Sequence, residues 1–75
     1  MQQPALMSIN GTALTFKTAA KVPAVVSIFN VNGRLVRQFS TTARSVDLRK
    51  GLGNGLYTVR AELQGRRAAL KMLVN

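Results

Sequence analysis

Residues 51–75 read GLGNGLYTVRAELQGRRAALKMLVN, and this stretch decides the fold of the chain. Apolar and polar residues alternate from residue 56 to residue 63, so one face of an extended strand collects Tyr57, Val59, Ala61 and Leu63. Gln64-Gly65 supplies the reversal, and the returning strand carries a second apolar row: Ala68, Leu70, Met72 and Val74. Chain ends usually fray, but this pattern persists almost to the last residue. The sequence therefore predicts a closing β-hairpin that builds the end of the chain into a sheet.

Two shorter strands are predicted near the start of the chain, over residues 5–9 and residues 13–17. Asn10-Gly11 lies between them and favours a type I′ turn, because both residues can adopt positive φ. A small hairpin is therefore expected ahead of the rest of the sheet.

The middle of the chain predicts another hairpin. Residues 24–31 are rich in β-branched side chains, and a second Asn-Gly pair at residues 32–33 leads into a returning strand over residues 34–39. The apolar residues of that strand cannot all share one face of a regular strand: Leu35, Val36 and Phe39. Either a β-bulge or burial on both faces would resolve this conflict.

A minimal strand at residues 46–48 and a loop with three glycines at residues 50–55 complete the pattern. Seven short strands at hairpin spacing predict an all-β fold, a small antiparallel β-sandwich that is immunoglobulin-like in general architecture. Residues 1–75 are expected to form one domain, without disulfides because the chain has no Cys. The pattern leaves the strand order open.

Catalytic chemistry has few candidates here. The chain has no His and no Cys, which excludes Ser/His/Asp and Cys/His arrangements. Asp47 and Glu62 are its two carboxylates, too few for a convincing acid–base pair or metal site. Residues 51–55 are rich in glycine but fit neither the GxGxxG motif nor the Walker motif, the two glycine-rich motifs that bind phosphate groups. We therefore expect the chain not to be an enzyme and to bind no cofactor or metal.

The net charge of +9 comes from 11 Lys and Arg against 2 Asp and Glu. It indicates either attraction to anionic partners or a solvated basic surface. The candidate contacts for an anionic partner are Arg34, Arg37, Arg60, Arg66, Arg67 and Lys71. Tyr57 shares the core row, so the exposed aromatic residues that stack on single-stranded nucleic acid or on sugars are scarce. No specific nucleic acid is expected as a partner.

Three segments resemble the type IX secretion system C-terminal sorting domain. VSIFNVNGRLV (residues 26–36) is similar to its strand with Tyr/Phe-Asp/Asn-x-x-Gly-Arg-x-Val, and GLYTVR (residues 55–60), after Leu48, is similar to its Gly-x-Tyr-x-Val-Arg strand. KMLVN (residues 71–75) resembles the closing strand of the family. The resemblance covers residues 22–75, and the basicity is similar to that of basic terminal domains on some fibrolytic bacterial enzymes.

The resemblance implies a small β-sandwich at the end of a larger secreted protein, recognised by outer-membrane secretion machinery. The start of the chain has no signal-peptide pattern, so we expect this sequence to be a piece of that longer protein. Localisation would be secreted or at the cell surface, reached through the periplasm and the outer membrane. Two departures are a missing Asn-Pro element near the first strand and Asn30 in place of the commoner Asp. Cleavage or retention of the domain is left open.

The predicted sorting signal consists of Gly55, Tyr57, Lys71, Met72, Leu73, Val74 and Asn75. A receptor could read this end through β-strand pairing, and Leu73 is predicted to face outward. The simpler interpretation is that Tyr57, Met72 and Val74 are core residues and that Gly55 makes a turn. The alternative function is a basic adhesion module that binds an anionic cell surface or acidic polysaccharide. Exposed edge strands also allow weak self-association.

Overall fold

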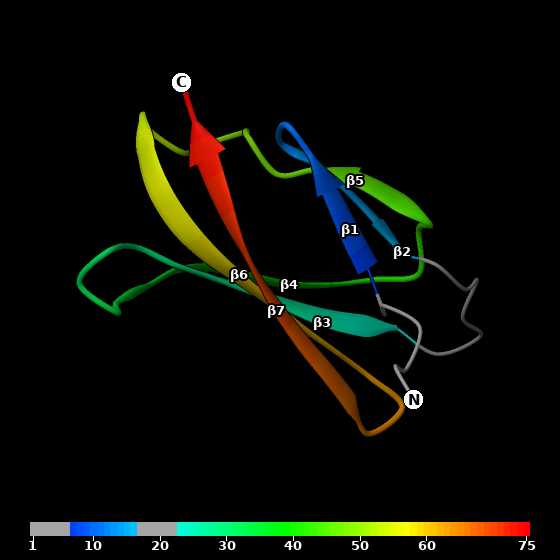
Figure 1. Cartoon of the computed structure of the whole chain (residues 1–75). Helices are drawn as coiled ribbons and strands as arrows, with labels where there is room; N and C mark the ends of the chain where they lie inside the picture. The colour runs from blue at the N-terminus through cyan, green and yellow to red at the C-terminus, as the bar shows by residue number, and fades with distance from the viewer. Residues whose placement is uncertain (1–6, 17–22) are drawn as a thin grey trace, which may run out of the picture.

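The computed structural model describes residues 7–16 and 23–75, which form seven strands and no helix (Figure 1). The strands are β1 (Met7–Asn10), β2 (Ala13–Phe16), β3 (Ala24–Phe29), β4 (Leu35–Thr41), β5 (Ser45–Asp47), β6 (Gly55–Leu63) and β7 (Arg66–Val74). Residues 5, 6 and 17, which belong to the first two predicted strands, lie outside the described residues. Three strands form one sheet in the order β1-β2-β5, and four form the other in the order β4-β3-β6-β7. All pairings are antiparallel, and the predicted all-β sandwich is confirmed.

The core lies between the two sheets, because alternate residues of each strand point into that space. The buried apolar side chains are Met7, Leu14, Phe16, Ala24, Val26, Ile28, Leu48, Val59, Ala61, Leu63, Met72 and Val74. Fully burying one large aliphatic side chain is worth about 1.5–3 kcal/mol. Both sheets contribute side chains to this core, so separating the two sheets would expose the inner face of each.

The predicted closing hairpin is confirmed. β6 and β7 pair without a register shift from Gly55 opposite Val74 to Leu63 opposite Arg66. Gln64 and Gly65 form the turn with φ of 51° and 78°, the two positive values of a type I′ turn. One residue of the predicted apolar rows differs, since Leu70 is 37% exposed. β1 packs against β7 but has only four residues, so the nine-residue β7 extends past this cover.

The turn between β1 and β2 is not the predicted type I′. Asn10 pairs with Ala13, so Gly11 and Thr12 are the two loop residues. Only Gly11 of these has a positive φ, 64°, as in a type II′ turn. The prediction was wrong because the register places Asn10 in the strand, and the glycine then occupies the first loop position.

Asn30 holds the turn of the β-hairpin that β3 and β4 form. Its backbone carbonyl accepts a hydrogen bond from the N–H of Gly33 at 3.0 Å, which closes a four-residue turn. Its Oδ1 accepts two more, from the N–H groups of Asn32 and Arg34, each at 3.0 Å. Gly33 follows with φ of 78°, a conformation that disfavours other residues. An aspartate would offer the same acceptor oxygen, so Asn in place of Asp keeps this turn.

The conflict between Leu35, Val36 and Phe39 is resolved by a β-bulge. Ile28 pairs with Arg37 and Phe29 pairs with Leu35, which leaves Val36 as the extra residue of β4. Leu35 and Val36 are 46% and 42% exposed, so burial on both faces is excluded. β4 also runs on to Thr41, past its predicted end at residue 39.

Asp47 joins β5 to the turn between β1 and β2. Its Oδ1 accepts hydrogen bonds from the hydroxyl of Thr12 at 3.1 Å and from the N–H of Arg49 at 3.0 Å. The N–H of Leu48 donates to the Thr12 carbonyl at 2.8 Å. The Arg49 bond first, and the Thr12 bond second, hold the pKa of Asp47 below its usual 3.8. These bonds fix the residues on either side of the buried Leu48.

Replacing Asn30 tests the turn between β3 and β4. We expect Asn30→Ala to lower the free energy of unfolding by about 1 kcal/mol, because two backbone N–H groups lose their protein acceptor. Asn30→Asp retains the acceptor and is expected to stay close to the unmodified domain. Urea denaturation of both variants measures the difference, and equal stability of Asn30→Ala and Asn30→Asp would contradict the role of Oδ1.

Asp47 makes the stability of the domain depend on pH. A carboxylate whose pKa is lower in the folded state stabilises above its unfolded pKa, and this contribution disappears as the pH falls through the folded value. The unmodified domain should therefore lose stability relative to Asp47→Asn as the pH falls through 3.8 and below. Denaturant unfolding at about pH 6 and about pH 2 measures this gap. Glu62→Gln is the matched control, and an equal change in that variant would argue against the Asp47 bonds as the cause.

Candidate recognition site at the last strand

The residues of the predicted sorting signal lie together at one end of the closing hairpin. Gly55 pairs with Val74, and Tyr57 pairs with Met72. Asn75 follows β7, and its backbone carbonyl accepts a hydrogen bond from the guanidinium of Arg49 at 2.9 Å. The last residue of the chain is therefore joined to the segment between β5 and β6.

The alternation along β7 divides this end into two sets of side chains. Met72 and Val74 are 2% and 1% exposed and belong to the core, as the simpler interpretation had it. Lys71, Leu73 and Asn75 are exposed, and Leu73, at 57%, faces outward as predicted. A partner that docks on the folded domain can touch the exposed set, whereas the buried set keeps the strand in place.

Tyr57 and Gly55 shape the loop that enters β6. The Tyr57 hydroxyl donates to the carbonyl of Gly53 at 2.8 Å, and its ring packs against the core. Gly55 has φ of 153°, in a region that essentially only glycine adopts. A Cβ at Gly55 would lie 3.9 Å from Cε2 of Tyr57, so backbone conformation rather than space requires the glycine. Both residues have a clear structural role at this end.

β7 is also an edge strand. The order β4-β3-β6-β7 gives it β6 on one side and, among the described residues, no strand on the other. Its edge carries no bulge over the paired residues. Unpaired N–H and C=O groups of such an edge are a template for another strand.

The six basic residues proposed for an anionic partner do not form one patch. Arg60, Arg67 and Lys71 share the outer face of the four-stranded sheet, where Arg67 lies 3.8 Å from Glu62. Arg37 instead stacks over the ring of Phe39 at 4.7 Å and donates to the Lys50 carbonyl at 3.2 Å. Arg34 follows the turn between β3 and β4, and Arg66 begins β7 beside the other turn. The fold therefore provides no single surface on which these six residues could contact an anionic polymer, as the alternative function of a basic adhesion module would need.

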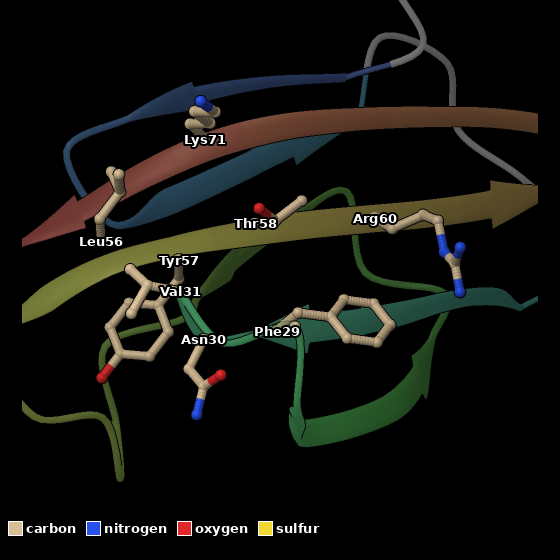
Figure 2. Close-up of a pocket in the computed structure, with 9 residues that line it drawn as sticks. Phe29, Asn30, Val31, Leu56, Tyr57, Thr58, Arg60 and Lys71 are labelled. Atoms are coloured by element: carbon tan, nitrogen blue, oxygen red, sulfur yellow. The ribbon is translucent and has the colours of Figure 1, made fainter.

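The outer face of the four-stranded sheet has an open hollow of about 480 Å³, which the sequence analysis did not predict (Figure 2). Its lining consists of Phe29, Asn30, Val31, Gly33, Leu56, Tyr57, Thr58, Arg60 and Lys71. The guanidinium of Arg60 lies 5.0 Å from the centre of the Phe29 ring. One feature of the sequence could have indicated this hollow. Leu56 is apolar, but it lies on the opposite face of the strand from the apolar row that begins at Tyr57, so its side chain faces outward.

Residues 7–16 and 23–75 hold no cluster of three or more acidic, His or Cys residues that could bind a metal ion. None of them belongs to a helix that is long and apolar enough to cross a membrane.

Fold and site together define a small β-sandwich domain whose last strand packs into the core and has a paired neighbour on one side only among the described strands. Residues 8–75 match the family model of the secretion system C-terminal sorting domain. The chain therefore belongs to this family, the C-terminal sorting signals of type IX secretion. The family consists of sorting signals rather than enzymes, and membership implies export of the attached protein and contact with the secretion machinery. No match was found among curated proteins or among solved structures.

Gly55→Ala tests the structural role of this glycine. We expect a loss of about 1–3 kcal/mol in the free energy of unfolding, because alanine is strained at this φ. Gly53→Ala is the matched control, since Gly53 has no positive φ and no neighbour within 4 Å of an added Cβ. Thermal or urea unfolding of the two variants gives the comparison, and equal stabilities would leave Gly55 without a backbone role.

Proposed function

We propose that this domain directs its parent protein through the bacterial outer membrane, from the periplasm to the outside, and that the secretion machinery reads the end of β7. Family membership carries the sorting function. The edge position of β7, together with its exposed Lys71 and Leu73, supports the choice of this strand as the part that is read.

The physical argument starts from the alternation of β7. Met72 and Val74 are buried, so the strand is already ordered before a receptor binds. The binding free energy then need not offset the entropy cost of ordering the strand. The opposite face then presents Lys71 and Leu73 in a fixed geometry. A receptor strand that pairs with the edge of β7 away from β6 would gain backbone hydrogen bonds, while these two side chains would distinguish this edge from others.

The role needs no catalysis, and we propose that the domain is not an enzyme. A receptor recognises a sorting signal by its folded shape or by pairing with an edge strand, and neither requires a cofactor. The parent protein would then carry any activity, and its final location would be outside the cell or at the cell surface.

Export of the full-length parent protein tests this proposal. Deleting residues 71–75 would also remove two core residues, so we prefer the double variant Lys71→Ala/Leu73→Ala, whose changed side chains are exposed. We expect its extracellular amount to fall by about tenfold, the factor that corresponds to about 1.4 kcal/mol of lost binding free energy, with accumulation in the periplasm. Immunoblots of periplasmic and culture fractions measure both.

The matched control is Val36→Ala/Arg44→Ala, an exposed apolar residue and an exposed basic residue away from β7. This control should be exported normally. Wild-type export of a correctly folded Lys71→Ala/Leu73→Ala variant would overturn reading through this strand. Normal export of a parent protein that lacks the whole domain would overturn the sorting function itself.

A further inference from the structure

The hollow on the outer face of the four-stranded sheet combines apolar and cationic side chains. Its apolar part includes Phe29, Val31 and Leu56, and the last two are 72% and 43% exposed. Leu73 pairs with Leu56 and is 57% exposed on the same face. Single exposed apolar residues are ordinary, but a cluster beside a hollow marks an interaction surface.

The cationic part consists of Arg60 and Lys71, and no carboxylate lines the hollow. Both carboxylates of the described side chains have partners elsewhere. Glu62 lies 3.8 Å from Arg67 farther along the same face, and Asp47 bonds to Thr12 and Arg49 at the other sheet. The hollow therefore carries a positive charge that nothing in its lining neutralises, and an acidic partner would be complementary to it.

We infer that this hollow binds an extended peptide segment in which an apolar residue is followed, at every second position, by acidic residues. Leu56, Thr58 and Arg60 alternate along β6 and face outward, and Lys71 lies opposite Thr58 (Figure 2). Every second residue of a strand advances by about 6.6 Å, so a peptide laid along β6 repeats with the same spacing. Its apolar side chain would contact Leu56 and Val31, and its carboxylates would reach Lys71 and Arg60.

A peptide fits this lining better than a sugar or a nucleotide base does. Sugars and bases bind to open aromatic faces, but Arg60 already stacks over the Phe29 ring. The Tyr57 hydroxyl is committed to the Gly53 carbonyl. Aliphatic side chains and two separate cations remain, and these match aliphatic and acidic side chains spaced along one extended backbone.

This inference rests on the proposed function for its biological setting, since Lys71 belongs to both, but binding itself can be measured without secretion. The partner would be an acidic, apolar segment of the machinery that reads the domain. The hollow would then supply side-chain specificity beside the edge of β7.

Titration of the full chain with a synthetic peptide, followed by NMR of the backbone amides, tests the inference. The probe is an acetylated and amidated peptide with the pattern Leu-Ser-Glu-Ser-Glu, and the controls replace its Glu residues by Lys or its Leu by Ser. We expect saturable shifts at the residues that line the hollow. Leu56→Ser and Arg60→Glu should each weaken binding by about tenfold or more.

Two control variants match these changes elsewhere. Val36 is 42% exposed, close to the 43% of Leu56, and Arg44 is an exposed arginine outside the hollow. Val36→Ser and Arg44→Glu should leave the affinity within about twofold. Equal binding of the Lys-containing peptide, or equal weakening by these controls, would overturn the inference.

Anionic phospholipid vesicles and alginate serve as competing probes. Saturable binding of either one at the hollow, without binding of the peptide, would overturn the peptide assignment and favour a polyanionic surface. Absence of peptide binding together with failed export of Lys71→Ala/Leu73→Ala would remove this inference and leave the proposed function standing. Peptide binding together with normal export of a correctly folded Lys71→Ala/Leu73→Ala variant would overturn reading through β7 and leave peptide binding at the hollow standing.

Discussion

The structure depends on the position of β6 inside the four-stranded sheet. β6 pairs with β3 on one side and with β7 on the other, and its buried Val59, Ala61 and Leu63 form part of the core. Every other strand of that sheet is placed by this ladder, directly or through β3. Since β7 has no second neighbour among the described strands, pairing with β6 and the burial of its inner side chains hold the last strand in the fold.

This arrangement couples the folding of the domain to the presentation of its end. The side chains that anchor β7, Met72 and Val74, alternate with those that it exposes, Lys71 and Leu73. When Met72 and Val74 pack into the core, Lys71 and Leu73 lie on the outer face, because successive side chains of a strand point to opposite faces. An unfolded chain would therefore lose the geometry of the exposed set. A receptor that reads this strand would, on our proposal, also sense that the domain has folded.

Sequence reasoning reached most of the local structure. Alternation predicted the closing hairpin and the outward direction of Leu73. The parity conflict on β4 left two solutions open, a bulge or burial on both faces, and the register shows the bulge at Val36. Sequence reasoning failed for the turn at Gly11 because an Asn-Gly pair does not say which of its residues ends the strand. It also overestimated the burial of Leu70, because the cover over an inner face depends on the length of the opposite sheet.

The sequence by itself determined the strands, the turn of the closing hairpin and which residues of β7 face the core, because these follow from a period of two and from the conformations that turn residues allow. Only the tertiary structure decided the strand order, the edge position of β7 and the hollow beside Arg60. The hollow joins side chains of β3, β6, β7 and the loop after β3, which are far apart in sequence. Pairing partners are chosen by how the whole core packs, and no local pattern contains that information.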